Sequence, residues 1–355
     1  MQMDDELQSQ TAPQDITGDD DALTESETLI EEFLADSGGG VVRDEGAVVA
    51  GDWDEELPPG HQSGFVALIG RPNVGKSTMV NALVGRKVTI VSAKPQTTRN
   101  RVIGILTEPN YQMIFVDTPG IHKRPLHQIN KMMIREAVAA IPDADVILFV
   151  VDVSARPRDV EETIARLLRE KAAKRPVLLV LNKIDQLTLR VAKSRFAAYE
   201  ALLPGRVGTI QVSALEGTNL DALHERLLTF LPAGPRYYPG DQITDQTEHQ
   251  IAAELIREAV FRYTYREIPH SAAVLVEDYY ERDNGVQYIA ARIWVERESQ
   301  KPIVIGKGGR LLKRIGTEAR KELERFIGGK VYLELWVKVK PRWRDEMARL
   351  RELGF

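Results

Sequence analysis

One eight-residue stretch, Gly70 to Ser77, constrains the fold of this chain more than any other feature. It reads GRPNVGKS and fits the spacing G-x-x-x-x-G-K-S of a phosphate-binding loop. The glycines let consecutive backbone N–H groups turn towards one anion, Lys76 adds a positive charge, and the Ser77 hydroxyl can bind Mg²⁺. An apolar run at 65–69 predicts a strand entering the loop, and residues 78–83 predict a helix leaving it. The arrangement predicts an α/β nucleotide-binding domain with a doubly wound, mostly parallel sheet.

The base of the nucleotide is indicated by a second segment, Asn182-Lys183-Ile184-Asp185, which follows the apolar run 177–181. A carboxylate at Asp185 can accept hydrogen bonds from both N1–H and the exocyclic amino group of guanine. Adenine offers neither donor, so it would leave the charge unpaired. We expect Asn182 to contact the ring edge or neighbouring loops, and the Lys183 stem to pack on the purine face. The segment predicts guanine.

A third segment, Asp117-Thr118-Pro119-Gly120, ends another predicted strand. An acidic residue at that strand end belongs near Mg²⁺, and Gly120 offers an unhindered N–H to a γ-phosphate. Residues 94–100 lie between this segment and the phosphate-binding loop, and they can supply a hydroxyl to the metal. We favour Thr98, with Thr97 as the alternative, because the sequence does not fix the register of such a loop.

Ser213-Ala214 completes the set, since it follows a short predicted strand and its backbone can close the guanine pocket. The predicted metal ligands are Ser77, Thr98 and Asp117. The predicted nucleotide contacts are Gly70, Arg71, Pro72, Asn73, Val74, Gly75, Lys76, Ser77, Thr78, Asp117, Thr118, Pro119, Gly120, Asn182, Lys183, Ile184, Asp185, Ser213 and Ala214.

These five segments, with the DTPG form and the paired threonines, resemble the Era branch of the translation-factor-like GTPases. The resemblance implies GTP and GDP with Mg²⁺ as ligands, and hydrolysis of GTP to GDP and phosphate. Ile121 follows Gly120, where Ras-like domains carry a water-orienting glutamine, so hydrolysis should be slow without a partner. Asn73 lies where some relatives hold K⁺, which makes K⁺ a hypothetical second cation. The catalytic residues implied are Lys76, Thr98, Asp117 and Gly120.

The C-terminal third carries a different signal, Gly306-Lys307-Gly308-Gly309, followed by helical periodicity over 310–327. Helix 245–263 and two strand-like runs joined by Asp-Asn-Gly precede it, and an alternating strand follows it at 331–339. The order resembles an α+β type II KH domain, whose GxxG loop clamps the backbone of a short single strand while a groove reads about four bases. Residues 301–344 hold 13 Lys/Arg against 4 Asp/Glu. The predicted RNA contacts are Gly306, Lys307, Gly308, Gly309, Arg310 and Lys313.

A GTPase domain followed by a KH domain is the layout of the Era family. That resemblance, and no spacing argument, implies single-stranded RNA at the 3′ end of 16S rRNA as partner and a role in assembly of the small (30S) ribosomal subunit. An RNA-binding module with weak or vestigial GTPase activity is the alternative. The chain has no cysteine, which argues against the tRNA-modifying relatives with a reactive cysteine and excludes disulfides.

The first 60 residues hold 18 Asp/Glu and one Arg, a net charge of −17, whereas the whole chain carries −5. The remainder is therefore about +12. Low apolar content predicts a disordered acidic extension at 1–62, followed by a GTPase domain at 63–232, a linker at 233–241, a KH domain at 242–341 and a C-terminal tail at 342–355. No apolar run is long enough for a membrane span. We expect a cytoplasmic bacterial monomer, and the resemblance allows loose association with the inner face of the membrane.

Overall fold

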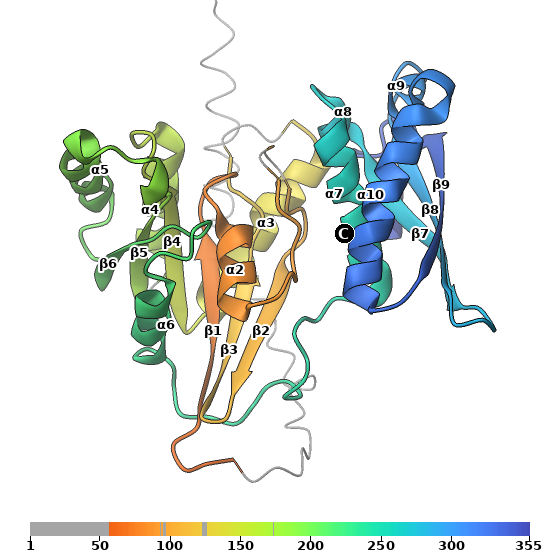
Figure 1. The fold of residues 1–355 in the computed structure, drawn as a ribbon. Helices are drawn as coiled ribbons and strands as arrows, with labels where there is room; N and C mark the ends of the chain where they lie inside the picture. Colours follow the sequence, from red (N-terminus) through yellow and green to blue (C-terminus); the bar gives the residue numbers. More distant parts are fainter. Residues whose placement is uncertain (1–56, 93, 95–96, 123–125, 173) are drawn as a thin grey trace, which may run out of the picture.

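The computed structural model describes residues 57–355 except 93, 95–96, 123–125 and 173. Most of the predicted acidic extension, residues 1–56, lies outside this range. Two domains stand side by side (Figure 1), joined by one connection along the chain. The predicted architecture of an α/β domain followed by a smaller α+β domain is confirmed.

The larger domain is built on a six-stranded sheet with the order β2-β3-β1-β4-β5-β6. Only β2 is antiparallel to its neighbour. All seven residues of β4 are buried, as expected for a parallel strand covered on both faces. The elements are β1 (Gln62–Ile69), α2 (Lys76–Val84), β2 (Val102–Glu108), β3 (Tyr111–Asp117), α3 (Gln128–Asp143), β4 (Val146–Asp152), α4 (Asp159–Lys171), β5 (Val177–Asn182), η1 (Ile184–Gln186), α5 (Leu189–Leu202), β6 (Gly208–Gln211) and α6 (Leu220–Leu228).

Each face of this sheet has its own apolar core. Helices α3, α4 and α5 pack on one face, with Ile141, Leu168 and Tyr199 fully or almost fully buried. Helices α2 and α6 pack on the other, through residues such as Val80 and Leu223. Because the parallel strands β1, β3, β4 and β5 point the same way, the loops at their carboxyl ends meet at one edge of the sheet. The three predicted segments that follow β1, β3 and β5 lie there.

The smaller domain is a three-stranded sheet, β7-β8-β9, in which β7 and β8 are antiparallel and β8 and β9 are parallel. Helices α7 and α10 cover one face of it (Figure 1). This is the order predicted for a type II KH domain. Its elements are α7 (Glu248–Tyr263), α8 (Ile268–Ser271), β7 (Ala273–Glu281), β8 (Gln287–Val295), α9 (Lys301–Ile305), η2 (Lys307–Gly309), α10 (Arg310–Ile327) and β9 (Val331–Val339).

The segment between the domains is laid against the larger one. The side-chain oxygen of Gln112 accepts hydrogen bonds from the backbone N–H groups of Tyr237 and Tyr238 at 2.8 and 3.0 Å, and the Tyr237 ring packs on Phe65. The larger domain was predicted to begin at residue 63, after the acidic extension. Its packed part begins earlier in the structure. His61 is buried and its ring nitrogen lies 2.9 Å from the Gly234 carbonyl.

The last 14 residues are likewise packed. Trp343 and Leu350, the latter on α11 (Met347–Glu352), are fully buried against Trp294 of the KH sheet and against Met133 of α3. Asp345 also accepts from His127 at the start of α3. The predicted C-terminal tail therefore joins the two domains. Among the residues the structure describes, no helix is both long and apolar enough to cross a membrane.

Candidate functional site

The phosphate-binding loop connects β1 to α2 in a tightly curved path. Gly75, the N-cap of α2, has φ 98°, and an added Cβ would lie 2.3 Å from the Asn182 side chain. The Lys76 ammonium is buried within the curve and donates to the carbonyls of Gly70 and Arg71 at 3.2 and 3.1 Å. Burial lowers the pKa of Lys76 to about 8, against the opposing attraction of Asp117. A buried cation among backbone N–H groups is suited to an incoming polyphosphate.

The three predicted metal ligands converge beside this loop. Ser77 Oγ lies 2.6 Å from Asp117 Oδ2 and 2.9 Å from Thr98 Oγ1. Thr89, which sequence reasoning missed, also donates to Asp117 Oδ2 at 3.2 Å. Burial raises the pKa of Asp117, opposed by Lys76 and by these hydroxyls. The other oxygen, Oδ1, is buried with no donor among the described residues. A carboxylate and hydroxyls around a buried acceptor fit a hard cation such as Mg²⁺.

The structure distinguishes Thr97 from Thr98 by the partners of their hydroxyl groups. The Thr97 hydroxyl turns back to the Lys94 carbonyl at 2.9 Å, whereas Thr98 points into the cluster with Ser77 and Asp117. Thr98 is thus the threonine placed to reach a metal. No sequence signal distinguishes two adjacent threonines, because the choice depends on how the loop is held from outside.

The guanine segment is tied to both neighbouring loops. Asn182 donates to the Val74 carbonyl at 2.7 Å and accepts from the Ala214 N–H at 3.0 Å. Asp185, in η1, is exposed, and its Oδ1 accepts from Ser213 Oγ at 2.5 Å. The Asn182 amide therefore fixes the loops relative to each other, while Asp185 is left facing outward with an oriented carboxylate.

Two predicted nucleotide contacts take part in a charge network that the sequence did not reveal. The Lys183 ammonium lies 2.8 Å from Asp152 at the end of β4, and the Arg71 guanidinium reaches Asp152 at 3.5 Å and Glu161 at 2.5 Å. Hydrogen bonds from Lys183 and Ser154 lower the pKa of Asp152 despite its burial. The side chains of Arg71 and Lys183 are therefore positioned by carboxylates of β4 and α4.

The loop after β3 packs closely on the phosphate-binding loop. An added Cβ at Gly120 would lie 2.5 Å from the backbone nitrogen of Pro72, so only glycine fits there. Ile121 is 1% exposed and donates its N–H to the Gly70 carbonyl at 3.2 Å. Because its side chain lies in the core, it cannot orient a water. Residues 123–125, further along this loop, lie outside the described residues.

Residues 87–99 are here called the bridging segment. They lead from α2 to the three predicted metal ligands Ser77, Thr98 and Asp117, here called the metal cluster, and they contact the KH domain on the way. The Lys94 ammonium donates to the carbonyls of Phe261 and Thr264, and Arg257 of α7 donates to the Thr97 carbonyl. Arg99 is buried and donates to the Ala272 carbonyl at 2.9 Å. The metal-cluster threonine is therefore flanked on both sides by bonds to the KH domain.

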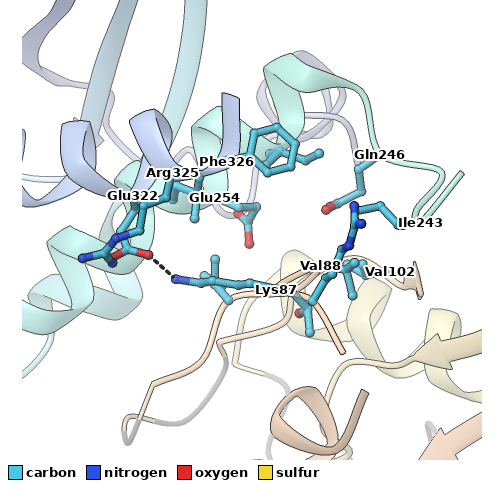
Figure 2. A pocket seen from close by; sticks show the side chains of 14 residues that line it. Lys87, Val88, Val102, Ile243, Gln246, Glu254, Glu322, Arg325 and Phe326 are labelled. Atoms are coloured by element: carbon cyan, nitrogen blue, oxygen red, sulfur yellow. Dashed lines mark hydrogen bonds and ion pairs between the residues drawn. The ribbon is translucent and has the colours of Figure 1, made fainter. Parts of the chain in front are cut away.

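The start of the bridging segment also lines a pocket of about 420 Å³ between the domains (Figure 2). Lys87 crosses it to pair with Glu258 at 2.5 Å and Glu322 at 3.1 Å, and Figure 2 shows the second of these pairs. Ile90 is buried in the apolar cluster that forms the KH core. The segment is thus anchored to both KH helices.

The predicted RNA loop projects from the KH domain between α9 and α10. Gly306, Gly308 and Gly309 all have positive φ, of 72°, 60° and 75°, and Lys307 and Arg310 are exposed. Beside the loop, α10 and β9 form a groove of about 480 Å³. It is lined by Gly309 and Lys313, which were predicted, and by residues that were not: Leu312, Gly316, Thr317, Arg320, Val331, Tyr332, Leu333 and Leu335. An apolar floor with a cationic rim suits stacked or splayed bases with phosphates outside.

Comparisons with known proteins agree with this geometry. The family described as 50S ribosome-binding GTPase matches residues 65–183, and the KH domain family matches residues 267–344. The chain is 51% identical to GTPase Era of Geotalea uraniireducens over 294 residues, covering 83% of this chain and 98% of that protein. It is 47% identical to GTPase Era of Thermotoga maritima, covering 82% and 97%.

Two solved structures extend the likeness to the fold. A crystal structure of Era in complex with MgGDPNP and nucleotides 1506–1542 of 16S ribosomal RNA matches with TM-score 0.79 and 40% identity, over 83% of this chain and 99% of that one. An Aquifex aeolicus Era variant bound to GDP and AlF₄⁻ matches with TM-score 0.78 and 39% identity, over 82% and 99%. The nucleotide segments and the KH domain agree with these matches, which extend along nearly the whole length of the relatives. The chain therefore belongs to the Era family of GTPases.

Proposed function

We propose that this chain is a GTP-hydrolysing RNA clamp that binds the single-stranded 3′ end of 16S rRNA during assembly of the 30S subunit. Support comes from the family and from the relative solved with MgGDPNP and a 16S rRNA fragment. The observation that carries the coupling is the position of the bridging segment. Thr98 lies 2.9 Å from Ser77 in the metal cluster, while the neighbouring Thr97 carbonyl is bonded to Arg257 of the KH domain.

In this proposal Ser77, Thr98 and Asp117 hold Mg²⁺, which when bound neutralises charge on the β- and γ-phosphates. Lys76 leaves its two carbonyl partners for the phosphates, and the Gly120 N–H donates to the γ-phosphate. Asp185 pairs with the guanine edge. Asn73 as a K⁺ ligand stays a prediction, to be tested by comparing hydrolysis in sodium and potassium buffers.

When GTP is hydrolysed, the γ-phosphate no longer helps to hold Thr98, which keeps only its contacts with Ser77 and Asp117. Because Thr97 and Arg99 are bonded to the KH domain, a shift of the bridging segment changes the position of α7. The domain boundaries, the monomeric state, the cytoplasmic location and the loose contact with the inner membrane face are still predictions from the sequence.

We expect RNA binding to depend on both the GxxG loop and the nucleotide. A labelled RNA copying the 3′ end of 16S rRNA should bind with different Kd values in the GDP and GTP-analogue states, because a ligand shifts an equilibrium only by differential affinity. Lys307→Asp/Gly308→Asp should weaken binding about 100-fold in both states by placing carboxylates against the RNA phosphates. Equal affinities in both nucleotide states would leave the KH role and remove the clamp.

The coupling should depend on Arg257. Allosteric coupling typically changes affinity by about 5- to 150-fold. In Arg257→Met, which keeps an unbranched apolar side chain but cannot donate to the Thr97 carbonyl, the ratio of RNA affinities between nucleotide states should fall to about 1–2. Arg262→Met is the matched control, because Arg262 of the same helix pairs with Glu318 inside the KH domain. Equal ratios in the two variants would place the coupling elsewhere.

A further inference from the structure

The outer face of the KH sheet, opposite α7 and α10, carries a row of tyrosines. Tyr280, Tyr288 and Tyr332 lie opposite one another on the three successive strands. Their ring centroids are 4.9 Å apart from Tyr280 to Tyr288 and 5.9 Å apart from Tyr288 to Tyr332. The Arg282 guanidinium lies over the last two rings, at 4.5 and 4.6 Å from their centroids. These four residues are here called the tyrosine row.

The tyrosine row is exposed, whereas the far end of the same face is covered. Tyr280 is 51% exposed and Tyr332 is 47% exposed, and Trp336 further along β9 is also 47% exposed. At the other end of the face, Trp294 is 1% exposed under Trp343 and the C-terminal segment. The C-terminal segment thus covers the half of this face around Trp294 and leaves the half with the tyrosine row exposed to solvent.

One residue connects this face to the groove assigned to RNA. Tyr332 belongs to the row and also lines the groove between α10 and β9. Strand β9 is an edge strand of the sheet, so a chain leaving the groove can pass over β9 without crossing another strand. The first rings that it would meet are those of Tyr332 and Tyr288.

We propose that the tyrosine row is a second RNA subsite, on which unpaired bases stack after the strand leaves the KH groove. This rests on the proposed RNA-binding function. Bases of single strands stack on aromatic rings and on arginine planes with little preference for sequence. Three tyrosines in register with an arginine over two of them form such a platform.

Charge on this face points to bases as the ligand in preference to phosphates. Arg292 is paired with Glu277 at 2.7 Å, and Glu334 accepts from the Tyr288 hydroxyl at 3.2 Å. Cations and carboxylates therefore nearly balance there, in contrast to the cationic GxxG loop. Binding to the row should add little to the salt dependence of affinity, which reports phosphate neutralisation.

The test uses the full chain and three single strands. The first is a short RNA from the 3′ end of 16S rRNA that fills the groove. The second carries four added adenosines, and the third carries four abasic nucleotides at the same end, with both ends tried. Stacking is worth about 5- to 150-fold in Kd per base. The added adenosines should therefore lower the Kd at least about 5-fold, whereas abasic nucleotides with the same charge should not.

Variants at Tyr280 separate this subsite from the groove, because Tyr280 does not line the groove. Tyr280→Leu should remove at least 5-fold of the gain from adenosines and leave the short strand unaffected. Tyr280→Phe, which keeps the ring, should retain the gain, and thermal melting should show both variants folded.

Equal gains from adenosines and abasic nucleotides, or a gain that survives Tyr280→Leu, would overturn the subsite while leaving the groove. Failure of the short strand to bind would overturn the RNA-binding function and this proposal with it.

Discussion

Replacing Asp185 by asparagine is expected to lower affinity for GDP by about 10⁴-fold and to create affinity for xanthosine diphosphate. The carboxylate can accept from N1–H and from the amino group of guanine. An amide presents an N–H₂ group to that amino group, so two donors face each other. Xanthine carries an oxygen in place of the amino group and can accept from the amide.

The structure makes this substitution informative because Asp185 is exposed and oriented by a single short bond to Ser213 Oγ. Asparagine is isosteric and can still accept from that hydroxyl. Calorimetry with GDP and xanthosine diphosphate measures both affinities. Ser213→Ala is the control, and it should weaken GDP binding only modestly by loosening Asp185, without creating affinity for xanthosine diphosphate. Loss of GDP affinity in Asp185→Asn without a gain of affinity for xanthosine diphosphate would mean that the residue holds the loop and does not read the base.

Replacing Lys76 by methionine is expected to slow GTP hydrolysis by about 10²–10³-fold at saturating nucleotide. The transferring phosphoryl group is stabilised almost wholly by positioned positive charge and N–H donors. Lys76 is the one cation buried inside the loop among the described residues, at 6% exposure. Its two present partners are carbonyls of the loop itself, so the fold does not depend on an ion pair that the substitution would break.

Single-turnover hydrolysis, measured with the GDP dissociation constant, checks this expectation. Methionine fills the space of the lysine stem, so loss of rate at full occupancy reports lost charge. Lys131→Met, on α3 away from the phosphate-binding loop, is the control and should keep the parent rate. A rate restored by more GTP would show that Lys76 contributes equally to substrate and transition state.

In the proposed clamp, the bridging segment would connect the nucleotide site to the groove on the KH domain. Its residues are held by different kinds of contact. Thr98 is held by hydroxyl and carboxylate groups of the nucleotide domain, and Arg99 and Lys94 are held by carbonyls of the KH domain. Such carbonyls are fixed in helices and turns, so they move with the domain as a whole. In the proposed clamp, a displacement of Thr98 would reach α7 through the Thr97 carbonyl, which accepts from Arg257.

Much of the nucleotide site could be predicted because its parts are local in sequence. The phosphate-binding loop, the segment at Asp117 and the segment at Asn182 each occupy a few consecutive residues after one buried strand. Parallel strands bring their carboxyl ends to one edge, so the order of the segments was enough to place them together. The KH domain followed in the same way from helical and alternating periodicity around the GxxG loop.

What the sequence could not supply were contacts between residues far apart along the chain. Only the packing of the bridging segment against α7, about 160 residues away, distinguishes Thr98 from Thr97 as the metal ligand. Asp152, which binds Lys183, sits at the end of a strand with no motif of its own. The covering of Trp294 by the C-terminal segment, and the exposure of the tyrosine row beside it, depend on how two domains and a tail share one sheet face. Sequence spacing thus determined the loops and their chemistry, because turn geometry and strand direction are local. The tertiary structure alone decided which side chains those loops present and what holds them, because burial depends on every surface that packs against them.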